Sequence, residues 1–594
     1  MYTGIVTDIQ WERVYLTISG TFRLVDDEDE KEALFRKRHP DFRDETRMGD
    51  PSKWVMTSAQ LEQRFYDWME DLKRRIDSSY DPDKMYMILH TGGFMQTYLL
   101  APEIDEEKGT FKVTINVTLF NGREQMPDAV LYLSIFHQGM SYQMNVSSEV
   151  MAHSFEYARP FTFNKVQNCY VVSVRSTSDE TDALFQLHSF LFERKRHRKF
   201  NLRTFVRETR DVIIKFFIKL YYLVLYTVVP HNGKRILFST ESRGNLQGNL
   251  KAVYEGMLKR GLDKEYKIYT SFRSAAGGNS SVSSWVRVIT YMAIADKILL
   301  DDYAPLLEWL TIRPKTKVIQ LWHAGVGFKS VGFCRFGGNG TPKLDNPHRQ
   351  YDYAIAGSTS LRKIYSEVFG IEEEAILPTG LPRIDSMLDK DENERKIREF
   401  QQEHPELKGK KLIIFAPTFR GMGAKTAFYP YDKLDMKRIY DMCGDKYVFV
   451  FKMHPFIQDR PEIPEEYSNR IKDFTGIGDV NDLLPVIDIM ITDYSSIIYE
   501  FSLFRRPILF FAYDKEQYSV IRGFQSDYDD FAPGKVCTTF DELEQAIVNE
   551  DFEVEKVDRF VEANFDHLDT GSTDRVIDQL VINTPKRKVS KCSI

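Results

Sequence analysis

The sequence predicts an α/β protein in which two doubly wound lobes follow an N-terminal β-rich domain. Three observations support this prediction: a length of 594 residues, a change in composition near residue 200, and two series of short apolar runs separated by helical stretches. The chain is about four times as long as a typical domain of roughly 150 residues, so several cores are expected. Its 42% hydrophobic and 28% charged residues are typical of folded domains and exclude global disorder.

Charge, cysteines and the first residues narrow the function class. The net charge of -7 argues against nucleic acid as a partner, because duplex binding usually needs a strongly basic domain. The five cysteines are too dispersed for a metal site and are expected to be reduced thiols. The N-terminus lacks the basic start and apolar run of a secretory signal, so a cytoplasmic location is expected.

Residues 1–190 are predicted to form a β-sandwich-like accessory domain with a polar insertion. The clearest runs of strand periodicity are Val14–Ile18, Phe111–Phe120 and Ala129–Phe136. The insertion consists of a charged stretch, Asp26–Arg47, and a helix-like segment, Thr57–Ile76. This region contains no cluster of catalytic residue types, so we assign it no activity.

Residues 191–230 are predicted to form a basic amphipathic helix. Four polar residues recur every four positions and leave a broad apolar face: Arg207, Asp211, Lys215 and Lys219. Internal lysines make this a poor membrane span, whereas a basic run beside an aromatic-rich helix suits an anionic bilayer surface. Two interpretations stay open: contact with the membrane through Lys215 and Lys219, or a linker helix packed on the next domain.

The remaining chain alternates between apolar strands and helices, which is typical of parallel sheets. A first lobe, residues 231–395, holds five predicted strands: Arg235–Thr240, Tyr266–Phe272, Lys297–Asp302, Lys317–Trp322 and Tyr351–Gly357. A second lobe, residues 396–580, holds four: Leu412–Ala416, Tyr447–Met453, Ile487–Thr492 and Pro507–Ala512. The charged helical segment Asp389–Lys410 joins the lobes, and residues 581–594 are predicted to be a basic tail. Ligands are expected in the cleft between the carboxyl ends of the two sheets.

Polar side chains follow several of these strands. His323 ends a strand of the first lobe and precedes two glycines and Lys329, which suits a general base beside an anion. In the second lobe the strand-end residues are Thr418, Arg420, His454, Asp493, Ser495 and Ser496. Serines at a helix start, and Arg522 in a turn-rich loop, are phosphate-binding candidates. Motifs of P-loop NTPases, nicotinamide dehydrogenases and GxSxG hydrolases are missing, which leaves a two-lobed transferase.

Six motifs between about residues 235 and 565 resemble the CDP-glycerol glycerophosphotransferases, the teichoic acid primases and polymerases of bacterial cell envelopes. They are WHAGVGFK, GLPRID, APTFRG, KMHP, TDYSS and RGF...DY...PG. One position departs from the family pattern, because Ala324 stands where a glycine usually follows the first histidine. The resemblance implies a GT-B type fold and transfer of glycerol or ribitol phosphate from a CDP-activated donor to a hydroxyl of a lipid-linked acceptor, with release of CMP.

The resemblance also implies roles for individual residues. His323 is the expected base, and His454 is expected either to hold the pyrophosphate or to protonate the departing phosphate. The other expected substrate-binding residues are Thr418, Arg420, Asp493, Ser495, Ser496, Arg522, Lys329 and Arg383. We expect no cofactor and no metal, because cationic and hydroxyl donors are numerous and no carboxylate cluster suited to Mg²⁺ is apparent.

A lipid-linked acceptor would place the enzyme at the cytoplasmic face of the cell membrane as a peripheral protein. Two other functions stay open: a nucleotide-sugar glycosyltransferase on the same fold, and an inactive membrane-surface adaptor that binds glycan. The sequence distinguishes neither glycerol from ribitol nor a primase from a polymerase.

Overall fold

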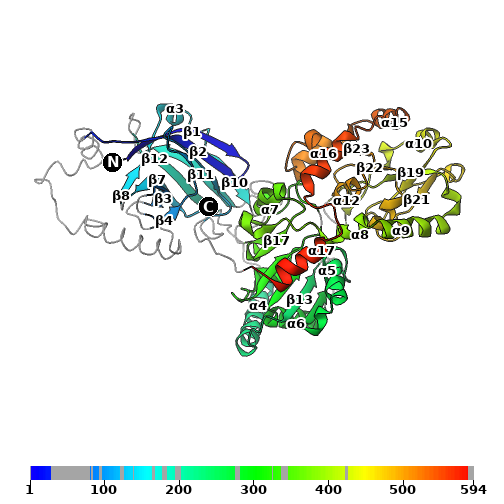
Figure 1. Ribbon diagram of the computed structural model, residues 1–594, viewed down its shortest axis with the longest axis horizontal. Coiled ribbons are helices and arrows are strands. Elements are labelled where there is room, and N and C mark those ends of the chain that lie inside the picture. The colour runs from blue at the N-terminus through cyan, green and yellow to red at the C-terminus, as the bar shows by residue number, and fades with distance from the viewer. Residues whose placement is uncertain are drawn as a thin grey trace, which may run out of the picture. The chain divides into compact units, whose positions relative to one another are not determined.

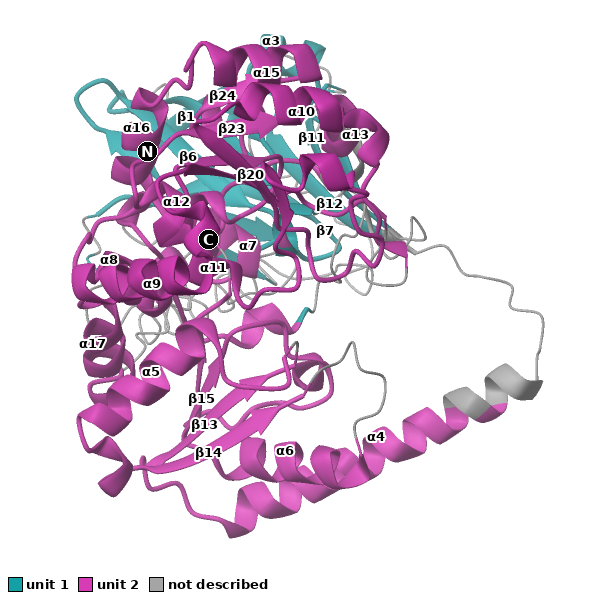
Figure 2. Ribbon diagram, turned by 90° about the vertical axis from the view of Figure 1, so that its right-hand side faces the viewer, with its two compact units in different colours: residues 1–198, 332–346, 587–594 teal, residues 199–331, 347–586 magenta. Residues whose placement is uncertain are grey.

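The computed structural model describes residues 2–27, 81, 84–91, 96–120, 126–137, 140–154, 156–163, 168–176, 183–193, 202–241, 243–273, 281–323, 325–335, 346–421 and 426–585. The predicted helix at 57–76, most of the charged stretch before it, and Ala324 lie outside these residues. The chain divides into two compact units. The first comprises residues 1–198, 332–346 and 587–594, and the second comprises residues 199–331 and 347–586 (Figures 1 and 2).

The first unit contains two sheets in which nearly all neighbouring strands are antiparallel. One has the order β5-β6-β2-β1-β9, and the other has the order β10-β11-β12-β7-β3-β4 with β8 paired to β7. The bounds are β1 Tyr2–Glu12, β2 Tyr15–Leu24, β3 Tyr86–Thr91, β4 Thr97–Leu99, β5 Glu103–Asp105, β6 Thr110–Asn116, β7 Ala129–His137, β8 Met140–Gln143, β9 Asn145–Val146, α3 Ser148–Ala152, β10 Arg159–Phe163, β11 Asn168–Ser176 and β12 Phe185–Glu193. Along β6, Phe111 and Val113 are buried and Lys112 is exposed, as a half-buried strand requires. Ile18 and Leu131, from different sheets, belong to one hydrophobic core.

The first lobe of the second unit is a six-stranded parallel sheet with the order β14-β13-β15-β16-β17-β18. Its elements are β13 Arg235–Thr240, α5 Gly248–Lys259, β14 Lys267–Phe272, α6 Val282–Ile294, β15 Lys297–Leu300, β16 Lys317–Gln320, β17 Tyr353–Ile355, α7 Arg362–Phe369 and β18 Ile376–Leu377. Buried apolar runs such as β15 fit a sheet covered on both faces. The five predicted strands are present, with ends that differ by at most two residues.

The second lobe is also a six-stranded parallel sheet, with the order β21-β20-β19-β22-β23-β24. Its strands are β19 Lys411–Phe415, β20 Tyr447–Phe451, β21 Ile471–Asp473, β22 Ile489–Thr492, β23 Ile508–Phe511 and β24 Lys535–Cys537. Its helices are α10 Met436–Cys443, α11 Val480–Leu483, α12 Ile498–Ser502, α13 Lys515–Arg522, α14 Tyr528–Phe531, α15 Phe540–Val548 and α16 Glu555–Asn564. Renumbered within the lobe, the strand order is 3-2-1-4-5-6, a doubly wound order that places ligands at the carboxyl ends of the strands. The predicted α/β fold with parallel sheets is confirmed.

The two lobes are joined twice. The chain passes from the first to the second through α8 Asp385–Leu388 and the charged helix α9 Lys390–Glu403. It then returns, because α17 Ser572–Val576 lies beside α5 of the first lobe (Figure 2). Arg260 of α5 bridges Asp574 at 3.2 Å and Asp578 at 2.6 Å. A single hydrophobic core includes residues of both lobes.

The helix α4, Leu202–Val228, is held at its C-terminal end and lies along α6 (Figure 2). The Tyr221 and Thr290 hydroxyls lie 2.8 Å apart. Arg313 is 6% exposed and donates to Tyr226 O at 2.9 Å and to Ala293 O at 2.9 Å. The carbonyl ends of α4 and α6 carry partial negative charge, so one buried guanidinium clamps both.

The remaining surface of α4 is apolar and exposed. Its exposed large apolar residues include Val206, Ile213, Phe217, Leu220, Val224 and Val228. Helical spacing puts Lys215 and Lys219 on the same side as Tyr222, which is buried against the lobe. Lys215 Nζ lies 5.0 Å from the centroid of the Trp309 ring. Both lysines are exposed on the side of the helix that lies beside Trp309, and the apolar face is exposed as well. Among the described helices, none is long and apolar enough to cross a membrane.

Candidate active site

His323 follows β16 and is oriented by the chain that follows β15. Its Nδ1 lies 3.0 Å from the carbonyl oxygen of Asp301 and 3.7 Å from the Asp302 carboxylate. A carbonyl oxygen only accepts hydrogen bonds, so Nδ1 carries the proton and Nε2 of the neutral ring is an acceptor. The side chain is 33% exposed, which lets Nε2 meet a substrate. His323 therefore has the tautomer that a general base needs.

The backbone beside His323 is fixed by an asparagine that sequence analysis missed. Trp322 has a left-handed φ of 49°, which is unusual for a large side chain. Buried Asn249, at the start of α5, donates to the carbonyls of Leu321 and Trp322 at 2.8 Å each. Its side-chain oxygen accepts from the backbone N–H of Arg383 at 3.0 Å. Asn249 thus stabilises a strained turn that aims the histidine.

Arg383, expected to bind substrate, connects His323 to the second lobe. Its guanidinium donates to the carbonyl oxygen of His323 and to the carboxylate of Glu500 in α12. Glu500 is 3% exposed; burial raises its pKa, and the charge of Arg383 opposes that shift. The structure therefore gives the Arg383 guanidinium two protein partners, one in each lobe.

The glycine-rich loop after His323 packs closely on the second lobe. A Cβ on Gly325 would lie 2.2 Å from the Tyr499 ring, so the approach needs a glycine. Two backbone hydrogen bonds join the loop to the segment after α13: Ser330 N to Gly523 O at 3.2 Å and Gln525 N to Phe328 O at 3.0 Å. This pairing carries Lys329 into the second lobe, where its Nζ lies 5.9 Å from the Tyr518 ring centroid.

His454 follows β20 and has the opposite tautomer. Its Nδ1 accepts from the backbone N–H of Phe456 at 3.1 Å, so the proton of the neutral ring is on Nε2. Burial, assisted by the positive charge of Lys329, lowers the pKa of His454 to about 4. His454 is therefore a neutral hydrogen-bond donor near pH 7. Because Lys329 belongs to the loop that follows His323, its influence on the pKa of His454 indicates that the loop lies near this second histidine.

Arg420, after β19, is held between two carboxylates. It donates to both oxygens of Asp514 at 2.6 and 2.8 Å, to Asp493 at 2.9 Å, and to its own neighbour Thr418 O at 2.6 Å. Burial disfavours the charge, but the two carboxylates outweigh it and raise the pKa of Arg420. The Arg420 guanidinium also lies 5.4 Å from the centroid of the Tyr513 ring. Arg420 is thus mainly an organiser of the site.

The other predicted residues lie around this group. Asp493 is 1% exposed and accepts from the backbone N–H of Thr418 at 2.7 Å, whereas the Thr418 hydroxyl is buried without a partner in the described part of the chain. Ser495 and Ser496 are half-buried just before α12, and Ser495 Oγ accepts from Ile497 N at 3.4 Å. Arg522 ends α13, and its side chain lies outside the described residues.

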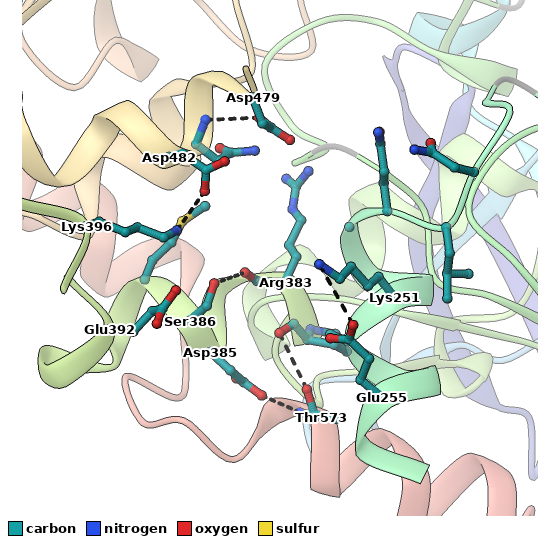
Figure 3. Close-up of a pocket in the computed structure, with 18 of the residues that line it drawn as sticks. Lys251, Glu255, Arg383, Asp385, Ser386, Glu392, Lys396, Asp479, Asp482 and Thr573 are labelled. Atoms are coloured by element: carbon teal, nitrogen blue, oxygen red, sulfur yellow. Dashed lines mark hydrogen bonds and ion pairs between the residues drawn. The ribbon is translucent and has the colours of Figure 1, made fainter. Parts of the chain in front are cut away.

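Two cavities adjoin these side chains. A cavity of about 260 Å³ beside Arg420 has mainly aromatic walls: Phe419, Phe428, Tyr513 and Tyr518. A larger cavity of about 690 Å³ is lined by both lobes, and Figure 3 shows Arg383 between Lys251 and Asp479. Several of its charges are paired, as in Lys396–Asp482 at 2.9 Å. Over the described residues, no group of three histidine, cysteine, aspartate or glutamate side chains is placed to hold a metal.

Sequence analysis missed four residues of this site. Asp301 and Asp514 directly follow or nearly follow strands β15 and β23, so their positions after strands were a usable signal. Asn249 and Glu500 lie within helices, and their partners are 72 and 117 residues away along the chain. Such pairs leave no local pattern.

The chain was compared with known proteins. The family described as CDP-Glycerol:Poly(glycerophosphate) glycerophosphotransferase matches residues 221–582. Teichoic acid ribitol-phosphate polymerase TarL of Staphylococcus aureus (strain NCTC 8325 / PS 47) is 37% identical over 70% of this chain and 72% of its own length. Teichoic acid ribitol-phosphate polymerase TarK of the same strain is 41% identical over 59% of this chain and 68% of its own.

A third relative and a solved structure agree with these matches. Teichoic acid poly(ribitol-phosphate) polymerase of Bacillus spizizenii (strain ATCC 23059 / NRRL B-14472 / W23) is 38% identical over 60% of this chain and 58% of its own. A histidine-to-asparagine variant of the wall teichoic acid polymerase TagF superposes with a TM-score of 0.52 at 25% identity, over 65% of this chain and 98% of that one. The chain belongs to the CDP-glycerol:poly(glycerophosphate) glycerophosphotransferase family.

Proposed function

We propose that this family member transfers ribitol phosphate from CDP-ribitol to a hydroxyl of a teichoic acid polymer and releases CMP. Transfer of an alditol phosphate from a CDP-activated donor follows from the family. The choice of ribitol is supported by relatives named for ribitol-phosphate polymerisation, which are 37–41% identical. Relatives named for glycerol phosphate are 25–32% identical.

The observation that supports the mechanism best is the pair of histidines with opposite tautomers. In the proposed reaction, the acceptor oxygen bonds to the phosphorus that carries ribitol, and the bond from that phosphorus to the CMP oxygen breaks. His323 Nε2 takes the proton of the acceptor hydroxyl. His454 Nε2–H donates to the phosphate oxygens as charge moves toward CMP.

The donor pyrophosphate is proposed to lie between His454 and the loop of His323. Lys329 offsets its charge, and the buried Thr418 hydroxyl is a donor that a phosphate can satisfy. The aromatic cavity beside Arg420 suits a cytosine ring, because any base can stack on aromatic side chains. Ser495, Ser496 and Arg522 remain proposed phosphate contacts, and Asp493 and Arg383 are proposed to orient their partners.

The test of this function is CMP release by the purified full chain with CDP-ribitol, CDP-glycerol and a UDP-sugar in turn, each with a lipid-linked acceptor. We expect turnover with CDP-ribitol to exceed that with CDP-glycerol, and no turnover with the UDP-sugar. Faster turnover of CDP-glycerol would show that the transferred group is glycerol phosphate and not ribitol phosphate. Turnover of the UDP-sugar alone would make the chain a glycosyltransferase and overturn the proposal.

We also propose that the enzyme works as a peripheral protein at the cytoplasmic face of the cell membrane, with its two lobes as a GT-B pair and its N-terminal sheets as a sandwich. Support for membrane contact comes from the open apolar face of α4, where Phe217 is 61% and Val228 is 73% exposed. A helix with such a face binds at the interfacial layer of a bilayer. Lys215 and Lys219, both exposed beside the lobe, remain proposed to assist this contact through their charge.

A further inference from the structure

A groove of about 440 Å³ lies between α4 and the segment Trp309–Pro314 of the first lobe. Its walls are apolar and aromatic, with Tyr222 and Tyr226 on the helix and Trp309 and Ile312 on the segment. The mechanism proposed above uses none of these side chains. The groove is therefore a candidate for a ligand of its own.

The groove is already formed without a ligand. The Tyr222 and Tyr226 rings are stacked with centroids 6.2 Å apart and planes 6° apart. Trp309 stacks on Trp285 of α6 with centroids 5.8 Å apart. The buried Arg313 guanidinium, bound to carbonyls of α4 and α6, fixes the helix against the lobe. A preformed site spares a ligand the cost of ordering its walls.

Positive charge lies at the same groove. Lys219 is one of its lining residues, and Lys215 stands over the Trp309 ring. Within the described part of the chain, neither ammonium group has a carboxylate within 4 Å. An apolar slot with unneutralised lysines matches a ligand that joins a hydrocarbon chain to a phosphate.

The groove opens beside the surface proposed to contact the bilayer. Leu223 lines it and is 51% exposed, next in sequence to Val224 of the open apolar face. A lipid held in the membrane would thus reach the groove from this side.

We propose that this groove binds the lipid end of the acceptor, with a hydrocarbon chain between Trp309 and α4 and its phosphate at Lys219. The inference rests on the proposed function and adds to it a lipid subsite separate from the CDP site. It makes the acceptor's lipid a determinant of recognition instead of a passive anchor.

The kinetic test uses two acceptors: one with a long hydrocarbon chain on its phosphate, and a water-soluble analogue of the same glycan phosphate with a very short chain. Ile312→Trp fills the groove, and Lys219→Gln removes its charge. We expect each variant to raise the KM for the long-chain acceptor by about tenfold or more, a loss near 1.4 kcal/mol. The KM for the short acceptor and for CDP-ribitol stays unchanged. Val228→Trp, on the open face outside the groove, is the matched control and leaves both acceptor KM values unchanged in detergent.

A binding test keeps the inference separate from catalysis. A brominated long-chain lipid phosphate is added to the full chain, and the quenching of tryptophan fluorescence is measured. The part of the quenching that is lost in Trp309→Phe reports binding at the groove. A loss of this quenching in Lys219→Gln, which adds no tryptophan, supports the groove. It does so even if CDP-ribitol proves inert, a result that would refute only the proposed reaction. Three results would overturn the inference: no Trp309-dependent quenching, equal quenching by an ordinary brominated phospholipid, or an equal rise of KM for both acceptors.

Discussion

At the scale of single residues, the two histidines are distinguished by their hydrogen-bond partners. Asp301 O fixes the proton of His323 on Nδ1, and Phe456 N fixes the proton of His454 on Nε2. One ring therefore presents an acceptor to the substrate and the other a donor. The family resemblance implied that His323 is the base but left two roles open for His454, because a tautomer depends on backbone groups that the fold brings together.

Replacement of His323 tests the role of the base. His323→Ala should lower kcat for CMP release by about 100- to 10,000-fold, the range that a positioned general base contributes. His153→Ala is the control, because the His153 side chain is 53% exposed in the first unit and pairs with the nearby Glu156 at 3.0 Å. Equal rates for His323→Ala and the control would remove His323 from the mechanism.

Replacement of Lys329 tests the contact between the loop and His454. Burial is the main cause of the low pKa of His454 and the charge of Lys329 lowers it further, so Lys329→Met should raise that pKa above about 4 without restoring the ordinary value near 6.5. Removal of a positive charge makes protonation of the ring easier. Histidine titration by NMR measures the shift, with Lys329→Arg as the charge-preserving control. A His454 pKa that is the same in all three proteins would show that the loop lies elsewhere.

At the scale of elements, helices distant in sequence position the loop of His323. Asn249→Ala removes the donors to the carbonyls of Leu321 and Trp322 and should lower kcat while leaving the KM for CDP-ribitol unchanged. In a His323→Ala background the same change should have no further effect on kcat. Lys259→Ala, on the exposed end of the same helix, is the control. A KM change, or full additivity with His323→Ala, would indicate a general loss of structure.

The helix α4 offers a second test at this scale. Phe217→Glu with Val224→Glu places charge on the open apolar face and should weaken sedimentation with anionic vesicles. Lys215→Glu with Lys219→Glu should weaken it less, because both lysines lie on the side of the helix beside Trp309 and not on the open apolar face. The reverse order of effects would restore membrane contact through the lysines.

The elements themselves were largely predictable from the sequence. Apolar runs such as Arg235–Thr240 gave strand β13 with the same bounds, and the charged segment around Lys390–Glu403 gave α9. Three short strands, β18, β21 and β24, were missed because two or three residues are too few to show periodicity. The packing of α4 on the first lobe was one of two interpretations that the sequence left open, since a polar stripe can face either water or a protein surface.

At the scale of the whole molecule, buried histidines in both units couple stability to acid. Burial lowers the pKa of His90 in the first unit, and of His348 and His454 in the second, to about 4 in each case. The unfolded chain takes up these protons near pH 6.5, so the stability that neutral histidines contribute is lost as the pH falls from 6.5 to 4.

The expected slope is up to about 1.4 kcal/mol per pH unit for each histidine in the unit concerned. Thermal unfolding between pH 7 and pH 4 measures it, and His348→Phe should flatten the dependence for the second unit. An unchanged slope in that variant would contradict the assignment. The prediction concerns stability only and leaves the proposed reaction untouched.

The sequence predicted two lobes but not the contacts that join them. Parallel sheets and strand-end ligands follow from sequence pattern, but the link from Asn249 through Arg383 to Glu500 depends on contacts across the lobes. Those contacts tie the orientation of His323 to the relative placement of the lobes. The proposed reaction therefore requires both lobes of the second unit.

The most direct test of the central claim is the stoichiometry of the reaction. The purified full chain is given CDP-ribitol labelled in ribitol and a lipid-linked acceptor, and free CMP and acceptor-bound ribitol phosphate are counted together. The account predicts one CMP for each ribitol phosphate joined to the acceptor, with both products lost in His323→Ala. CMP release without incorporation, or incorporation that persists in that variant, would contradict it.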